Sequence, residues 1–281
     1  MNKNIFIYTF LFVLIFSIGC KNIQNNEVLN VALGAQEYSL GKNRVIFSII
    51  AEEEFYVKKN YKVKIRNTKN KINSPEIDTI FYNWPNKSKG FYSFTYNFNE
   101  YGEYEIDIYE LENPNLKYTT KITTNEIQTP IVGEVVPNLN NKTIFDNSDL
   151  TKISSDPDPD PDFYSQKFSD AINTKQPVIV FFISPNFCKT ATCFPQLDVI
   201  KRLKHVYDDK IIYIHVEVYE NPHLIKGNLQ NAKISDVLNE WNIKSEPYTF
   251  LIKNKKLVSK FQGYVSYEEI DNDIDKILDV N

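Results

Sequence analysis

Hydrophobic and polar residues alternate along several short stretches between about residues 28 and 131. Tyr61, Val63 and Ile65 fall on one side of an extended chain, and basic residues fall on the other. The stretch 103–109 repeats this alternation with acidic residues between its apolar ones. A period of two is typical of a strand that buries only one face. We therefore predict strands at 30–33, 44–50, 61–66, 91–98 and 103–109.

Around seven short strands in about 100 residues favour an all-β immunoglobulin-like sandwich over any helical fold for residues 28–131. The stretch 98–106 resembles the strand, glycine turn and strand that end small extracytoplasmic sandwich modules. This region contains no cysteine and no histidine. We therefore expect a spacer or a binding module here, and no catalytic site.

The pattern changes after residue 163, where helical and strand patterns alternate. The unbroken apolar run 176–183 is typical of a central parallel strand, and 210–218 is a second such run. Helical periodicity is expected at 168–173, 194–207, 234–241 and 267–278, and an antiparallel pair of strands at 248–252 and 256–261. This order predicts an α/β domain over residues 163–281.

Residues 132–162 separate the two regions and are rich in Asn, Asp, Ser and Pro. They end in four aspartates that alternate with three prolines, from Asp156 to Asp162. Each proline fixes its own φ and favours an extended conformation in the residue before it. We therefore expect a stiff acidic linker.

The amino terminus has the pattern of a secretory signal. Lys3 precedes an apolar run of about 14 residues that ends at Gly19 and Cys20, shorter than the roughly 20 residues that a spanning helix needs. The ending Ser17-Ile18-Gly19-Cys20 resembles a bacterial lipobox. This resemblance implies that residues 1–19 are removed and that Cys20 becomes a lipid-modified anchor on the extracytoplasmic face of a membrane.

Charge and cysteine content narrow the function classes. The chain has 32 basic and 36 acidic residues, a net charge of −4, which argues against nucleic acid as a partner. Of its three cysteines, Cys20 is assigned to the anchor, so only Cys188 and Cys193 remain. An exported chain with two such cysteines is no disulfide-rich miniprotein, and its stability must come from apolar cores.

The spacing of Cys188 and Cys193 constrains where they lie. Two residues five positions apart on one helix would be separated by about 140° around it and about 7.5 Å along it, beyond disulfide reach. Cys188 must therefore lie in a loop, with Cys193 at or near the start of the helix. A cysteine just before a helix amino terminus favours the thiolate, and Lys189 adds a positive charge.

The cysteine loop and a later proline together resemble the thioredoxin-like superfamily. The loop directly follows the first long buried strand, and Pro247 lies where those proteins carry a cis-proline before a strand. The sequence is also similar to an extracytoplasmic group that joins a sandwich domain to a Cys-four-residues-Cys-Gly-Pro loop, although Phe194 occupies the glycine position here. The resemblance implies an α/β thioredoxin-like domain preceded by an all-β immunoglobulin-like sandwich.

Three hypotheses remain open for the cysteine pair. In the first, Cys188 attacks and Cys193 resolves in thiol-disulfide exchange with client proteins and a redox partner, without a cofactor. In the second, the pair is a permanent structural disulfide in a non-catalytic lipoprotein that acts as a binding scaffold. In the third, the two thiolates bind Cu(I), with His223 as the best available third ligand.

Three other polar residues and a group of aromatics in the same half of the chain could act together with the cysteine pair. His215 lies in a buried strand and is expected to be a core residue, and His205 is expected on a solvated helix face. Glu217 is a candidate for a buried proton relay behind the resolving thiol. The aromatic residues of a possible client-binding patch are Phe187, Phe194, Trp241 and Tyr248.

Overall fold

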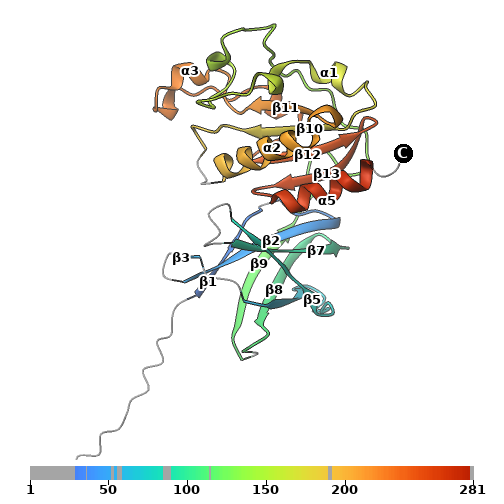
Figure 1. Cartoon of the computed structure of the whole chain (residues 1–281). Coiled ribbons are helices and arrows are strands. Elements are labelled where there is room, and N and C mark those ends of the chain that lie inside the picture. Colours follow the sequence, from blue (N-terminus) through green and yellow to red (C-terminus); the bar gives the residue numbers. More distant parts are fainter. Residues whose placement is uncertain are drawn as a thin grey trace, which may run out of the picture.

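The structure is a computed structural model, which describes residues 29–278 except residues 36, 52–53, 56–58, 85–89, 114 and 189–191. The expected signal, Cys20 and Lys189 lie outside the described residues. Three β-sheets account for most of the regular structure that is described (Figure 1).

Two antiparallel sheets form the amino-terminal half. The first has the order β1-β2-β7-β6 with β3 beside β2, and the second has the order β5-β4-β8-β9. Their bounds are β1 (Leu29–Leu33), β2 (Gly41–Ala51), β3 (Glu54–Phe55), β4 (Tyr61–Asn67), β5 (Ile77–Asp78), β6 (Ile80–Asn83), β7 (Gly90–Phe98), β8 (Gly102–Glu110) and β9 (Lys117–Thr124). All five predicted strands are present as β1, β2, β4, β7 and β8.

The third sheet contains β10 (Val178–Ile183), β11 (Ile212–Glu217), β12 (Tyr248–Lys253) and β13 (Lys256–Gln262) in the order β11-β10-β12-β13. β11 runs parallel to β10, whereas β12 runs antiparallel to both of its neighbours. Every residue of β10 and β11 is buried, as expected for continuous apolar runs. The carboxyl end of β10 therefore meets the amino end of β12 at one edge of the sheet.

Among the described residues, two helices exceed a single turn, α2 (Cys193–Tyr207) and α5 (Tyr267–Leu278). They contact each other on one side of the third sheet (Figure 1). The other α-helices have four residues each: α1 (Phe168–Ala171), α3 (Pro222–Ile225) and α4 (Val237–Glu240). Four short 3-10 helices lie at Leu150–Lys152, Pro161–Tyr164, Asp208–Lys210 and Leu229–Asn231. No helix in the described part of the chain has the length and apolar character needed to cross a membrane.

The fold class expected from the sequence, an α/β thioredoxin-like domain after an all-β immunoglobulin-like sandwich, is wrong. Taken as a whole, the regular structure of the described chain is mostly β, with three sheets and only two helices of more than one turn. The connection from β11 to β12 shows why. Pro222 starts a helix that ends after one turn at Lys226, whose φ is +45°, and Ile234 forms a β-bridge with Tyr219 where a helix was expected to begin.

The acidic tract expected to be a stiff linker is packed against the third sheet and α2. Asp156 is buried, with its Oδ2 3.0 Å from the Lys201 Nζ, and Asp160 pairs with Lys204 at 2.8 Å. The backbone N–H of Ser155 donates to the Glu217 carboxylate at 2.7 Å. Opposite charge on α2 therefore holds this tract against the protein.

The amino-terminal sheets share one continuous core with the side of the third sheet that α2 and α5 cover. Phe181 of β10 points into this core, and its neighbour Phe182 points into a second core on the opposite face, which contains Trp241. The successive residues separate because side chains alternate along a strand. The two halves of the chain are thus joined by buried apolar contacts.

Polar contacts reinforce this junction. The Arg44 guanidinium on β2 donates to both oxygens of Glu269 on α5, at 2.7 and 2.8 Å, and to the Tyr264 carbonyl at 3.1 Å. At Gly263, which has a φ of +74°, a Cβ would lie 2.3 Å from the Gly34 carbonyl oxygen. The backbones of the two halves therefore approach each other as closely as a glycine permits.

Candidate functional site

Cys188 and Cys193 form a disulfide between the end of β10 and the start of α2, with 6.1 Å between their Cα atoms. Cys193 is the first residue of α2 and is fully buried, whereas Cys188 lies in the preceding turn and is partly exposed. Both cysteines thus lie where their spacing in the sequence predicted, Cys188 in a loop and Cys193 at the helix start. One cysteine is therefore partly exposed and the other is buried.

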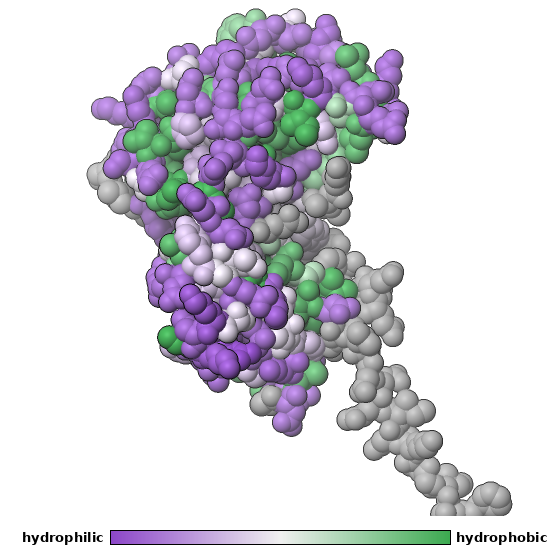
Figure 2. Space-filling model, turned by 180° about the vertical axis from the view of Figure 1, so that it is seen from behind, coloured by the Kyte–Doolittle hydropathy of each residue, from purple (hydrophilic) through white to green (hydrophobic). Residues whose placement is uncertain are grey.

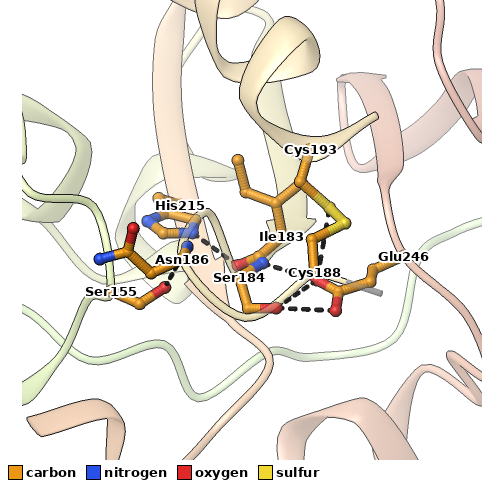
Figure 3. Close-up of a disulfide and its surroundings, with 8 residues drawn as sticks. All are labelled: Ser155, Ile183, Ser184, Asn186, Cys188, Cys193, His215 and Glu246. Atoms are coloured by element: carbon orange, nitrogen blue, oxygen red, sulfur yellow. Dashed lines mark hydrogen bonds between the residues drawn. A yellow bond between two sulfur atoms is a disulfide. The ribbon is translucent and has the colours of Figure 1, made fainter. Parts of the chain in front are cut away.

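Backbone hydrogen bonds position the loop that carries Cys188. The N–H groups of Phe187 and Cys188 both donate to the Ser184 carbonyl, at 3.0 and 2.9 Å, and the Asn186 N–H donates to the Ser155 hydroxyl at 3.3 Å (Figure 3). Ser184 directly follows β10 and Ser155 belongs to the packed acidic tract. The turn before Cys188 is therefore fixed from two sides.

A carboxylate that the sequence analysis did not select lies beside the disulfide. Oε2 of Glu246 is 3.6 Å from the Cys193 sulfur. The same oxygen accepts hydrogen bonds from the N–H and the hydroxyl of Ser184, both at 2.6 Å (Figure 3). The carboxylate is therefore held against the buried sulfur.

The position of Glu246 follows from strand register. Phe182 of β10 pairs with Tyr248 of β12, so the residues after β10 and those before β12 meet at one edge of the sheet. The Glu246–Pro247 peptide bond is cis, and the Pro247 carbonyl accepts a hydrogen bond from the Gly263 N–H at 2.9 Å. The sequence contained a signal for Glu246, because it directly precedes the proline expected beside the cysteine loop.

His215 is a buried core residue, as expected. Its Nε2 contacts the Ile183 carbonyl at 2.9 Å, its Nδ1 contacts the Tyr164 hydroxyl, and its ring stacks on Phe181. Burial lowers the pKa of His215 to about 4. At neutral pH the imidazole is therefore uncharged. His205 is exposed on α2.

His223, the histidine considered as a copper ligand, does not join the cysteines. It is exposed on α3 and lines a separate cleft of about 680 Å³. Glu217, Glu220 and Lys142 also line this cleft. Within the described residues, the group of potential metal ligands at the disulfide consists of Cys188, Cys193 and Glu246.

Glu217, the candidate proton relay, is buried but serves another partner. Its carboxylate accepts hydrogen bonds from the backbone N–H groups of Ser155 at 2.7 Å and Tyr219 at 3.3 Å. Burial raises the pKa of Glu217 to about 7, against these hydrogen bonds, which lower it. Glu217 thus holds the acidic tract in place. The position beside the Cys193 sulfur, predicted for Glu217, is occupied by Glu246.

Only part of the expected aromatic patch is accessible. Trp241 and Tyr248 are buried, Phe187 is partly buried, and Phe194, directly after Cys193, is 44% exposed. Figure 2 shows the molecule from behind, where hydrophilic residues cover most of the described surface and hydrophobic ones are scattered. Of these four aromatics, Phe187 and Phe194 are thus the two that are exposed, in part, next to the cysteines in the chain.

Comparison with known proteins shows no family for this chain. No family model and no curated protein matches it. A crystal structure of a DUF4426 family protein from Pseudomonas aeruginosa PAO1 is 8% identical, with 35% of this chain and 93% of that chain covered and a TM-score of 0.25. MtrC from Shewanella baltica OS185 is 12% identical, with 42% and 24% covered and a TM-score of 0.23. TM-scores this low support no argument about the fold or the activity of this chain.

Proposed function

We propose that this protein is a thiol-disulfide oxidoreductase of the cell envelope, in which Cys188 and Cys193 exchange their disulfide with client proteins. The observation that carries the proposal is the unequal pair itself, a partly exposed Cys188 bonded to a buried Cys193 beside the Glu246 carboxylate. In an exchange reaction of this kind, one cysteine bonds to the client and a second, protected cysteine then resolves the mixed disulfide.

In the reducing direction, the proposed exchange has two steps. The Cys188 thiolate attacks a client disulfide, forms a mixed disulfide and releases one client thiolate. The Cys193 thiol then gives its proton to Glu246 and attacks the Cys188 sulfur, which releases the second client thiolate. The client gains two electrons and the cysteine pair loses two. Oxidation of a client dithiol runs through the same steps in reverse.

The start of α2 supports thiolate chemistry at this pair. Cys193 occupies the first position of a helix of 15 residues. Unpaired N–H groups and the helix dipole at such a terminus stabilise a nearby anion. They lower the pKa of a thiol, which increases the fraction of reactive thiolate.

Mixed-disulfide trapping tests the proposal. Without the resolving thiol, a Cys193→Ala variant should retain clients covalently at Cys188, and they should be released by reductant. Cys188→Ala is the matched control, because it leaves only the buried sulfur. The proposal fails if Cys193→Ala retains nothing in the native envelope and the wild-type pair stays oxidised across glutathione buffers from reducing to oxidising. That result would leave a permanent structural disulfide.

Membrane attachment through Cys20 belongs to the same proposal and rests on the amino-terminal sequence. A lipid-modified Cys20 would keep the protein at the extracytoplasmic face of a membrane, where protein disulfides persist. A Cys20→Ser variant should move the protein from the membrane fraction to the soluble fraction of the envelope or leave its signal uncleaved. Unchanged processing and fractionation would contradict lipid anchoring.

A further inference from the structure

Three side chains with metal-binding atoms converge at the disulfide. The two sulfurs of Cys188 and Cys193 and a carboxylate oxygen of Glu246 all lie within 4.8 Å of one another. They come from three separate segments, the loop after β10, the start of α2 and the loop before β12. When the disulfide is reduced, these segments present two thiols and a carboxylate to one point.

We propose that the reduced protein binds a zinc ion through the Cys188 and Cys193 thiolates and the Glu246 carboxylate, with water as the fourth ligand. This goes beyond disulfide exchange, since it requires only that the pair can be reduced. Zinc accepts a mixture of sulfur and oxygen ligands in tetrahedral geometry.

The distance between sulfur and carboxylate suits this ion. Zn–S bonds of about 2.3 Å and Zn–O bonds of about 2.1 Å at a tetrahedral angle place the two ligand atoms about 3.6 Å apart. The Cys193 sulfur and the Glu246 Oε2 are 3.6 Å apart. The two sulfurs need about 3.8 Å between them on the same geometry, so the pair must separate after reduction. Cys188 can supply this movement because it lies in a partly exposed turn.

The donor set favours zinc over copper. Cu(I) selects soft thiolate and thioether ligands, and a carboxylate oxygen is a hard donor. His223, the imidazole that would have favoured copper, lies outside this group. Ca²⁺ and Mg²⁺ prefer oxygen ligands, so a site with two thiolates does not suit them.

Hydrogen bonds hold the proposed oxygen ligand in place. The Ser184 N–H and hydroxyl donate to Oε2 of Glu246, and the hydroxyl also lies 2.7 Å from Oε1. Such supporting contacts fix the orientation of a ligand, and losing one typically lowers metal affinity about 10- to 100-fold. The carboxylate is thus oriented before any ion arrives.

Zinc binding and the disulfide exclude each other. An external dithiol transfers two electrons and two protons to the Cys188–Cys193 bond and becomes a disulfide itself. Zinc then replaces the two thiol protons, which pass to solvent. The sulfurs cannot rejoin until the ion leaves, so the ion protects the reduced pair from oxidation.

Competition with a chromogenic zinc chelator tests this proposal on the full-length protein without oxygen. Reduced wild type should remove one zinc ion per chain from the chelator, and oxidised protein none. Glu246→Gln should bind at least about tenfold more weakly, in line with loss of a ligand contact. His223→Ala, the matched control, should bind like wild type.

A second readout guards against misfolded variants. Cobalt added to reduced wild type should give the sulfur-to-metal absorption of two thiolates, and Cys188→Ser, altered at a partly exposed position, should halve it. The proposal is overturned if reduced wild type takes no zinc at micromolar concentration, if oxidised protein binds equally well, or if Glu246→Gln binds as tightly as wild type. No client protein takes part in the zinc measurements. The zinc-binding proposal and the disulfide-exchange proposal can therefore be contradicted separately.

Discussion

Glu246 is the residue on which both proposed activities of the cysteine pair depend. It is the carboxylate next to the buried sulfur, and Ser184 holds it there. A carboxylate in this position accepts the proton that Cys193 must lose before it attacks. General-base assistance of this kind typically contributes about 100-fold or more.

A Glu246→Gln variant should therefore resolve mixed disulfides about 100-fold more slowly, because a neutral amide accepts no proton. Loading Cys188 with a coloured aromatic thiol makes the step visible, since attack by Cys193 releases the dye. The difference should shrink at high pH, where solvent deprotonates Cys193. Glu220→Gln, which alters a carboxylate paired with Lys142, should leave the rate unchanged. Equal rates for Glu246→Gln and wild type would remove Glu246 from the reaction.

Glu217 should make folding stability depend on pH. Its folded-state pKa of about 7 exceeds the ordinary value of 4.5, so folding takes up a proton between these pH values. The stabilising contribution is complete below about pH 4.5 and is lost as the pH rises to about 7, in total about 3 kcal/mol. Urea unfolding at pH 5 and 7.5 should show a smaller loss for Glu217→Gln than for wild type. An equal loss of unfolding free energy in Glu217→Gln and wild type would show that Glu217 does not cause the pH dependence.

Individual residues were predictable from sequence where the evidence was local. The spacing of Cys188 and Cys193 alone placed one in a loop and the other at a helix start. Glu246 was missed because its proximity to the disulfide depends on the register between β10 and β12. In that register Val178 pairs with Ile252, which lies 74 residues later in the chain. Glu217 was selected from its parity on a strand, which does not reveal that Ser155 binds its carboxylate.

At the scale of elements, the acidic tract is the least expected feature. Its alternating prolines predicted a stiff extended linker, but the tract bends at residues 157–158 and begins a 3-10 helix at Pro161. The prolines also gave no sign that α2 presents Lys201 and Lys204 to its aspartates. Strands were easier, because alternation of apolar residues is a local signal. The helix expected over 234–241 shrank to four residues because Ile234 bridges to Tyr219, a tertiary contact that helical periodicity cannot reveal.

The ion pair of Asp156 should contribute to the docking of this tract. Its side chain is 5% exposed and contacts Lys201, so Asp156→Ala should lower the free energy of unfolding by about 2 kcal/mol. Asp162→Ala is the control, since that side chain is 68% exposed and should contribute less than about 1 kcal/mol. Urea unfolding measures both. A loss for Asp162→Ala as large as for Asp156→Ala would show that burial is not the cause.

At the scale of the whole molecule, the two halves are joined by a shared core and by Arg44. Arg44 and Glu269 are 14% and 9% exposed, whereas Arg66 and Glu105, within the second sheet, are 39% and 20% exposed. Removing one partner of a buried pair costs about 3 kcal/mol or more, and an exposed pair contributes about 1 kcal/mol at most. Arg44→Ala should therefore destabilise the protein far more than Arg66→Ala.

The two tryptophans of the chain allow a direct measurement, because Trp84 lies in the amino-terminal half and Trp241 in the carboxy-terminal half. Single-tryptophan variants should unfold at the same urea concentration in the wild-type background, and Arg44→Ala should separate the two transitions. Separate transitions already in the wild-type background would mean that the halves unfold independently.

The contact between Gly34 and Gly263 has a mechanical consequence. Gly263 touches the amino-terminal half on one side and donates its N–H to the Pro247 carbonyl on the other, and Pro247 follows the glutamate beside the disulfide. A pull on the amino-terminal sheets would thus act on Gly263 and, through its hydrogen bond, on Pro247 next to Glu246. If the proposed membrane anchor and the proposed client exchange are both correct, tension between membrane and client would load the segment that holds Glu246 beside the disulfide.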